Sequence, residues 1–261
     1  MKAHLVIASC VIGLLTAAVS SRAVPPGYVL QGSDEFNGNA LNTNYWNCKT
    51  GWRHSAYNTP AAISVTNGCL AITTYTQGGT NYTGFINTDK KIAMRFGYYE
   101  ASIQFSNAPG NWSAFWLQSP YVGSARSLDN PTNGVEIDIF EHLYTDRKGK
   151  LMVNGGDTAL HWNGYGANHR HSGWSSTNLG IASGFHTYGL LWTSNRYTTY
   201  VDGALFGATN YPISTALQFI LLTSEVESNS WAGTVPGGGY PNSTNSQLKM
   251  LVDYVRYYAR P

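Results

Sequence analysis

Gly134-Val-Glu-Ile-Asp-Ile-Phe-Glu-His142 is the segment that decides the fold, because it interleaves β-forming apolar residues with three acids. Valine, isoleucine and phenylalanine favour strands, and a glycine marks the start of the run. The acids are Glu136, Asp138 and Glu141, three of only 14 acidic residues in the chain. A solvated run of charges would lack the apolar residues between them. The pattern alone therefore predicts a strand, in its simplest form half-exposed with one acidic face.

The spacing of the three acids predicts an irregularity in this strand. Side chains alternate between the faces of a sheet, so Glu136 and Asp138 share a face and Glu141 falls on the other. A one-residue β-bulge at Ile139 or Phe140 would return Glu141 to the face of the other two. The two glutamate carboxyl groups would then come to roughly 5–6 Å from each other, the separation of a retaining glycosidase. Asp138 between them would push the neighbouring pKa values apart, as acid and nucleophile require.

The rest of the chain divides into short apolar or alternating runs bounded by Gly, Asn, Ser or Pro, which predict strands. Asp202-Gly203 is a two-residue hairpin signal, because both residues tolerate positive φ. Helical periodicity is scarce, so we expect an antiparallel sandwich or jelly roll in one domain over residues 24–261. Two polar stretches, 155–184 and 229–246, are expected to be long loops over one face. The predicted strands are 61–65, 69–75, 97–105, 114–118, 135–140, 187–192, 197–201, 218–222 and 248–258.

The first residues predict secretion. Lys2 and His4 precede an apolar run, 5–19, which ends in small residues, and this is the pattern of a signal peptide over residues 1–23. The run is shorter than a membrane span, so no membrane partner is expected. It also continues past Cys10, which argues against a lipoprotein cleavage site there. We expect an extracellular or periplasmic protein.

Composition narrows the class of partner. Charged residues make up 11% of the chain, aromatic residues 13%, and the net charge is +2, which does not favour nucleic acid. Aromatic rings with few charges suit neutral sugar rings, although β-structure alone selects a similar composition. After the leader only Cys48 and Cys69 remain, and in an oxidising compartment we expect a disulfide. Two separately buried thiols are the alternative.

The acidic strand, read as Glu-x-Asp-x-x-Glu with Ile between the acids, resembles the bulged catalytic signature of glycoside hydrolase family 16. The resemblance implies a concanavalin-like β-jelly roll, with Glu136 as nucleophile, Asp138 as its assistant and Glu141 as acid/base. It extends in the expected order over almost the whole mature chain. The further motifs are Asp34-Glu-Phe-Asn-Gly38 with Trp46, Arg95-Phe-Gly-Tyr-Tyr-Glu-Ala101, Gly110-Asn-Trp-Ser-Ala-Phe-Trp-Leu117, Phe185-His-Thr-Tyr-Gly-Leu-Leu-Trp192 with Tyr200-Val-Asp-Gly203, and Leu251-Val-Asp-Tyr-Val-Arg-Tyr257.

Aromatic and histidine side chains are candidates for sugar contacts. Trp112 and Trp116 share a face by parity, and the resemblance puts their positions at the border of the cleft, although core packing would also explain them. His161 and Trp162 follow the acidic strand by about 20 residues, where the family commonly has a strand with a cleft-facing histidine.

The pair Glu225 and Glu227 departs from the family pattern. Laminarinase-like relatives usually carry an apolar, glycine-rich stretch there, so this difference leaves the substrate open. The pair is either a loop-edge feature or a set of acceptors for sugar hydroxyls, with Glu225 next to Trp231.

No cofactor is expected for catalysis. His142, His169 and His171 lack the spacing and carboxylate company of a catalytic zinc site. The resemblance implies a structural calcium ion held by backbone carbonyls and Asp253, although Asp253 would equally suit a hydrogen-bonded corner.

These patterns together predict a monomeric, endo-acting, retaining β-glycosidase that hydrolyses a polysaccharide, foremost a β-1,3- or mixed-linked β-glucan. A galactan hydrolase acting on agar or carrageenan is the alternative, as is a transglycosylase with the same site. A non-catalytic carbohydrate-binding jelly roll is the rival from another class, and the complete set of three acids argues against it.

Overall fold

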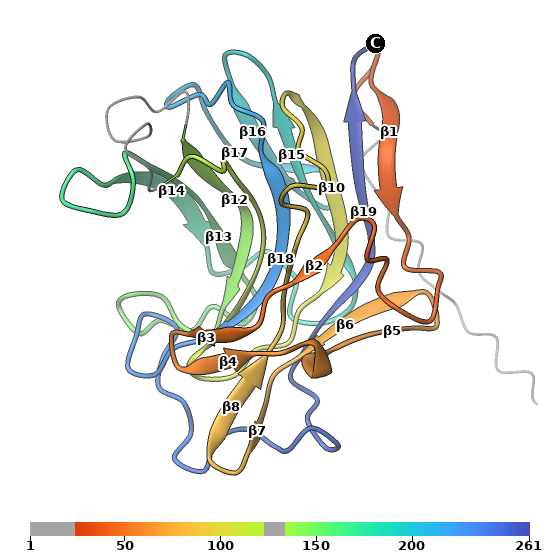
Figure 1. Cartoon of the computed structure of the whole chain (residues 1–261). Helices are drawn as coiled ribbons and strands as arrows, with labels where there is room; N and C mark the ends of the chain where they lie inside the picture. Colours follow the sequence, from red (N-terminus) through yellow and green to blue (C-terminus); the bar gives the residue numbers. More distant parts are fainter. Residues whose placement is uncertain (1–23, 123–133) are drawn as a thin grey trace, which may run out of the picture.

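Two antiparallel sheets stacked face to face form the body of the protein in a computed structural model, which describes residues 24–122 and 134–261 (Figure 1). Within those ranges the only helical element is a 3-10 turn, η1 (Pro60–Ala62). The predicted all-β jelly-roll sandwich is therefore confirmed. The predicted leader, 1–23, lies outside the described residues. No helix in the described ranges is long and apolar enough to cross a membrane.

One large sheet has eight strands. They are β1 (Val29–Asp34), β5 (Ile63–Thr66), β6 (Cys69–Thr73), β10 (Gly97–Gln104), β15 (His186–Trp192), β16 (Tyr197–Val201), β17 (Ala204–Thr209) and β19 (Lys249–Ala259). Their order is β17-β16-β15-β10-β19-β6-β5, and β1 also pairs with β19, so that the two ends of the described chain lie side by side (Figure 1).

The other large sheet has seven strands and contains the acidic segment. They are β2 (Asn47–Cys48), β9 (Phe85–Asn87), β11 (Asn111–Gln118), β12 (Val135–Leu143), β13 (Gly156–Trp162), β14 (Arg170–Ser176) and β18 (Phe219–Val226). Their order is β14-β13-β12-β11-β18-β9-β2. A small third sheet at one end consists of β3 (Gly51–Arg53), β4 (Ala56–Asn58), β7 (Tyr75–Gln77) and β8 (Thr80–Thr83).

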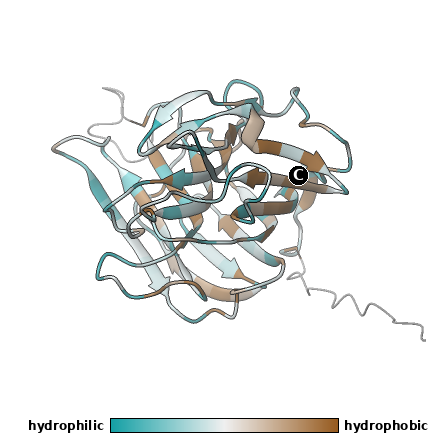
Figure 2. Cartoon of the chain, turned by 90° about the horizontal axis from the view of Figure 1, so that it is seen from below, coloured by the Kyte–Doolittle hydropathy of each residue, from teal (hydrophilic) through white to brown (hydrophobic). Residues whose placement is uncertain are grey.

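The core lies between the two large sheets. Ile137 of β12, Leu190 of β15 and Val252 of β19 are fully buried members of one apolar cluster that spans both sheets. Burying a side chain of this kind contributes about 1.5–3 kcal/mol to the free energy of folding. Figure 2 shows the apolar residues, in brown, concentrated in the strands, whereas the surrounding loops are mostly hydrophilic.

The predicted strands are found in the structure, except that the segment 69–75 is divided between β6 and β7, which belong to different sheets. The segment 61–65 begins in the turn η1, which Thr59 caps by accepting from the backbone N–H of Ala61. The stretch 155–184 is not one long loop, because it contains β13 and β14. Its polar residues face the cleft or lie on an edge strand, so their polarity did not indicate a loop. Asp202 and Gly203 both have positive φ and connect β16 to β17 as predicted.

The expected disulfide is not formed. Cys48 and Cys69 are free thiols in the structure, one on β2 of the seven-stranded sheet and one on β6 of the other. The Sγ of Cys69 donates to the carbonyl oxygen of Leu70 at 3.3 Å. Burial raises the pKa of both thiols, which disfavours the reactive thiolate.

Candidate active site

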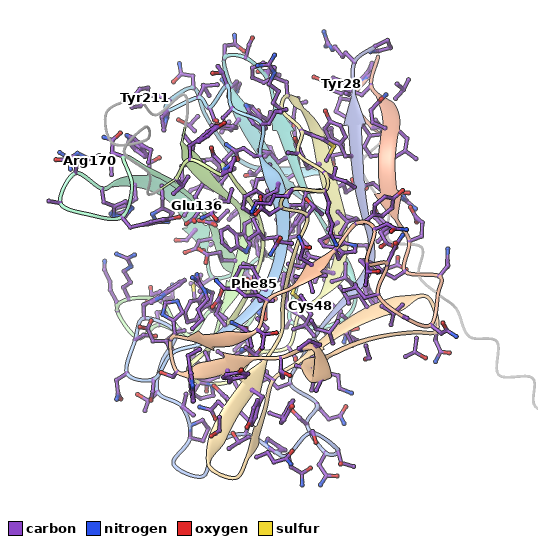
Figure 3. All side chains as sticks on the ribbon, viewed as in Figure 1. Tyr28, Cys48, Phe85, Glu136, Arg170 and Tyr211 are labelled. Carbon is purple, nitrogen blue, oxygen red and sulfur yellow. The ribbon has the colours of Figure 1, made fainter. Side chains whose placement is uncertain are left out.

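A cleft of about 710 Å³ lies on the outer face of the seven-stranded sheet. Side chains from β11, β12, β13, β14 and β18 line it, together with Arg53 of β3 and Trp231 of a loop. In Figure 3 the labelled Glu136 lies on the side of β12 that faces away from the eight-stranded sheet. All three acids of β12 line this cleft.

The bulge predicted in β12 is present and brings the three acids to one face. Phe140 pairs with Phe115 of β11, and Asp138 pairs with the next residue, Trp116, so Ile139 is the extra residue. Ile139 and Phe140 both belong to the core cluster, one after the other, and the alternation then resumes with Glu141 outward. The carbonyl oxygen of Ile139 accepts from the Thr158 hydroxyl at 3.0 Å, which satisfies a group that the bulge removes from the ladder.

Gly156 of β13 makes room for this bulge. A Cβ atom at Gly156 would lie 2.4 Å from the carbonyl oxygen of Glu141 and 2.4 Å from the ring of Phe140. Both distances are far below van der Waals contact. The close approach of β13 to the bulged strand therefore requires glycine at this position.

Two donors bind the first acid. Gln118 of β11 donates from Nε2 to Oε2 of Glu136 at 2.8 Å, and the Tyr165 hydroxyl donates to the same oxygen. Burial raises the pKa of Glu136, while these two hydrogen bonds act in the opposite direction. The donors thus favour the ionised form that a nucleophile needs.

Asp138, which is 4% exposed, lies between the two glutamates in an environment that opposes ionisation. Burial, followed by the charges of Glu141 and Glu136, raises the pKa of Asp138 well above its usual range. His161 Nε2 lies 3.5 Å from Asp138 Oδ2. This environment therefore favours the protonated form of Asp138 beside the first acid.

The third acid has a carboxyl neighbour that is not on its own strand. Glu141 pairs with Asp157 across β12 and β13, and their side chains are hydrogen bonded. Burial raises the pKa of Glu141 well above its usual range, and the negative charge of Asp157 raises it further. The environment thus favours protonation more strongly at Glu141 than at Glu136, where two hydrogen bonds oppose the effect of burial, and this difference suits an acid and a nucleophile.

Three histidines gather beside the acids. His161 Nδ1 lies 2.9 Å from His169 Nε2, and His171 stacks on both rings with centroids 6.0 Å away. Burial, then the neighbouring His169 and His171, lowers the pKa of His161 to about 4, so this ring is neutral at pH 7. Glu136, Asp138 and His161 are the only group of three potential metal ligands among the described residues. A cation bound there would occupy the first acid.

The chain is similar to known proteins over most of its length. The family model for the GH16 domain of β-porphyranases A–D matches residues 28–260. The chain belongs to glycoside hydrolase family 16. Endo-1,3-1,4-β-glycanase ExsH of Rhizobium meliloti is 29% identical over 76% of this chain and 39% of its own length. The κ-carrageenase of Pseudoalteromonas carrageenovora is 29% identical over 74% of this chain and 56% of its own.

Solved structures show the same architecture. SCLam, a non-specific endo-β-1,3(4)-glucanase from family GH16, superposes with a TM-score of 0.72 and 25% identity, over 92% of this chain and 94% of that one. The endo-β-1,3-glucanase of Pyrococcus furiosus has a TM-score of 0.70 at 22% identity, over 89% and 94%. This family 16 chain spans well under half the length of the first curated relatives it matches, 39% and 37%.

Most of the predicted sugar contacts of this family 16 chain line the cleft. Trp112, Trp116, His161, Glu225 and Trp231 all do so. The ring centroids of Trp112 and Trp231 lie 5.3 Å apart, and Trp116 Nε1 donates to the Thr223 hydroxyl at 3.1 Å. The shared face predicted for the two β11 tryptophans is therefore confirmed.

Trp162 is a correction. It packs in the core between the sheets, 8% exposed, with an edge-to-face contact to Tyr211. His161 and Trp162 are neighbours on β13, so when the histidine faces the cleft the tryptophan must face the interior.

Glu225 is not part of a loop edge. It lies on β18, 3% exposed, and accepts from Arg53 Nε at both carboxylate oxygens, at 2.9 and 2.8 Å. Its charge is therefore already paired, and Arg53 is the group that faces the cleft with unused guanidinium donors nearby. Oε1 of the neighbouring Glu227 lies 3.6 Å from His54 Nδ1.

Four residues of the site are absent from the sequence-based prediction: Arg53, Gln118, Asp157 and Tyr165. Parity offers a signal for two of them, because Gln118 shares a face with Trp116 and Asp157 shares one with His161. Tyr165 lies in the loop after β13, where no periodic pattern predicts its direction. His142 faces the core, stacked on Phe105, and takes no part in the cleft.

Asp253 lies exposed on β19 of the eight-stranded sheet. It does not belong to a group of three potential metal-ligating side chains within the described residues. A calcium ion there would depend on backbone carbonyls and water, as the prediction assumed, and the ion remains a proposal.

Proposed function

We propose that this chain is an endo-acting glycosidase that cleaves a β-linked polysaccharide with retention of configuration. The observation that carries the proposal is the bulge at Ile139, which directs Glu136, Asp138 and Glu141 to one face at the floor of an open cleft. A binding protein needs no such crowded acids, whose charges oppose one another.

In the first step Glu136 attacks the anomeric carbon and forms a glycosyl ester. Gln118 and Tyr165 orient the attacking carboxylate through its Oε2. Glu141 gives its proton to the departing oxygen as the glycosidic bond breaks. Asp138 lies beside Glu136 and, when protonated, avoids a second charge next to the nucleophile.

In the second step Glu141, now ionised, takes a proton from water, whose oxygen attacks the anomeric carbon. The ester to Glu136 breaks, and both acids return to their starting forms. If a sugar hydroxyl took the place of water, the same site would act as a transglycosylase.

The cleft supports internal cleavage of a polymer. Six strands contribute to its lining, and tryptophans lie on the β11 side of the acids. Flat aromatic rings stack on sugar faces and would bind sugar units on that side of the scissile bond.

For the substrate we favour an agar-type galactan related to porphyran. The porphyranase family model spans nearly the whole described chain, and Glu225, which is paired with Arg53, lies in a segment where laminarinase-like relatives usually carry an apolar, glycine-rich stretch. A β-1,3- or mixed-linked β-glucan is the second candidate, because glucan endo-1,3-β-glucosidase A1 of Niallia circulans and a β-glucanase of Acetivibrio thermocellus are among the similar proteins.

Incubation with porphyran, agarose, κ-carrageenan, laminarin and barley β-glucan tests both candidates, with reducing ends and product size as the readout. We expect oligosaccharides from porphyran first, and proton NMR should show the β-anomer as the initial product. Cleavage of laminarin alone would select the glucan candidate. Binding without cleavage of any polymer, or inversion at the anomeric carbon, would refute the proposal.

Secretion and a monomeric state belong to the same proposal. The leader 1–23 fits export, and a polymer substrate lies outside the cell. Activity in the culture medium of cells that express the full chain, and a monomer by light scattering, are the expected results.

A further inference from the structure

Asp157 is a carboxyl group at the floor of the cleft for which the proposed mechanism has no role. It lies directly opposite Glu141 in the antiparallel pairing of β12 and β13, on the same face. Residues so paired have Cβ atoms about 4.5–5.5 Å apart, and two like charges there repel each other. Their side chains are nevertheless hydrogen bonded, which requires one of the two carboxyl groups to carry a proton.

The residues next to Asp157 on β13 lie close to the bulged strand. Oδ1 of Asp157 is buried and has no hydrogen-bond partner among the described residues. On β13, the adjacent Thr158 is bonded to the bulge, and Gly156 approaches it closely. β13 therefore lies close to the bulge, which brings Asp157 alongside the strand that carries Glu141.

The charged and titratable groups that face this pair come from each neighbouring element. They are Asp138 and Glu136 on β12, Arg147 in the loop after β12, His161 on β13, His171 on β14 and Glu225 on β18. Arg147 favours the ionised form of Asp157, whereas the carboxyl groups of Glu136 and Glu225 oppose ionisation of Glu141. The proton of the pair therefore belongs on Glu141.

We propose that Asp157 is a positioning residue that accepts a hydrogen bond from protonated Glu141 and keeps the proton there until the glycosidic oxygen takes it. This inference rests on the proposed function, in which Glu141 is the acid/base. The ionised Asp157 makes loss of the proton to solvent unfavourable, because two adjacent carboxylates would remain. In the second step the same repulsion makes ionised Glu141 a stronger base toward water.

The pKa shifts agree with a proton on Glu141 and a charge on Asp157. Burial raises the pKa of Asp157 to about 7, partly offset by Arg147, and the charge of Asp157 adds to the rise at Glu141. Ionisation of Asp157 thus favours the protonated form of Glu141. Activity that needs the Glu141 proton is lost as pH rises through the pKa of Glu141, which lies above its ordinary value.

The test is the pH dependence of kcat/KM for the polysaccharide, across about pH 4 to 10, in the wild type and in Asp157→Asn. Asparagine keeps the shape and removes the charge. We expect the alkaline limb to move to lower pH by about one unit or more, with the melting temperature unchanged or higher because a like-charge pair is removed. Asp157→Ser gives a second, smaller variant, and Asp89→Asn, which lies outside the cleft, is the matched control.

An aryl glycoside with a good leaving group separates a proton-holding role from a structural one. Its glycosylation needs no proton, so kcat/KM of Asp157→Asn should stay within about twofold of the wild type on this substrate. An alkaline limb that does not move, or equal losses on both substrates, would overturn the inference.

Glu141→Gln tests the premise separately. We expect it to lose polysaccharide hydrolysis, to keep reactivity toward the activated substrate and to recover turnover when azide replaces water. If Glu141→Gln kept wild-type polysaccharide hydrolysis, the proposed function itself would fail and the role of Asp157 with it. If it behaves as expected, the profile of Asp157→Asn alone decides the inference.

Discussion

The two large sheets each bury carboxyl groups, but they treat them in opposite ways. Glu100 on β10 of the eight-stranded sheet is 2% exposed, and each of its oxygens accepts from a tyrosine hydroxyl, Tyr98 and Tyr254, both at 2.8 Å. Asp138 and Glu141 on β12 of the seven-stranded sheet face other acids instead, and their pKa values rise. Buried charges that only stabilise a fold are given donors, whereas those poised for proton transfer are crowded with other acids.

The largest effect in this comparison should come from Glu136→Gln. Without a nucleophile, kcat/KM on the polysaccharide should fall on the order of 10⁴-fold. The melting temperature should stay the same or rise, because a neutral amide replaces one of several adjacent carboxyl groups. Glu100→Gln is the counterpart on the other sheet, and it should lose stability and keep activity. A Glu136→Gln enzyme with wild-type kcat/KM would contradict the role assigned to Glu136.

Gly156→Ala should damage both stability and activity, since the new methyl group would push on the bulge. We expect the free energy of unfolding to fall by about 1–3 kcal/mol and kcat/KM to fall with it. Gly32→Ala on β1, where a Cβ atom meets nothing within 4 Å, is the matched control and should change neither. Urea titration together with the standard assay would measure both, and equal behaviour of the two alanine variants would refute the steric role of Gly156.

Two tyrosine-to-phenylalanine changes sharpen the contrast between the sheets. Tyr254→Phe removes a donor from buried Glu100 and should lower the free energy of unfolding by about 1–3 kcal/mol without altering the pH profile.

Tyr165→Phe removes a donor from Glu136, whose pKa should then rise. Because the nucleophile must be ionised, the acidic limb of kcat/KM should move to higher pH. An acidic limb that stays in place would mean that Tyr165 has no influence on the charge of Glu136.

The smallest expected effect concerns calcium at Asp253. If the ion binds there, millimolar calcium should raise the melting temperature by a few degrees relative to EDTA, and Asp253→Ala should abolish the difference while activity at 25 °C stays about the same. A melting temperature that does not respond to calcium or EDTA would remove this proposal.

The sequence predicts much of this architecture because alternation and turn chemistry act locally. The bulge follows from three acids at positions whose parity disagrees, and the hairpin at Asp202 follows from residues that accept positive φ. The same alternation excludes Trp162 from the cleft once His161 is known to face it. The prediction erred there only because both residues were assigned to one face.

What the sequence leaves out depends on which strands become neighbours. Asp157 acquires its importance from a pairing with Glu141 that no spacing encodes, and Arg53 meets Glu225 across 172 positions of the chain. The stretch 155–184 looks like a loop because its polar residues face a cleft that only the folded sheet creates. Likewise, Cys48 lies in the seven-stranded sheet and Cys69 in the eight-stranded sheet, and their separation in sequence does not reveal this.

The extra residue at Ile139 also bears on how this strand tolerates changes in length. In a regular strand, inserting one residue turns every later side chain to the wrong face. Here Ile139 and Phe140 both enter the core, so the insertion is absorbed within two residues and the acids on either side remain in register with the cleft. Deleting Ile139 would give Glu-x-Asp-x-Glu, in which plain alternation aims the same three acids outward. The strand can thus present the same three acids to the cleft with or without Ile139, because this core residue acts only as a spacer.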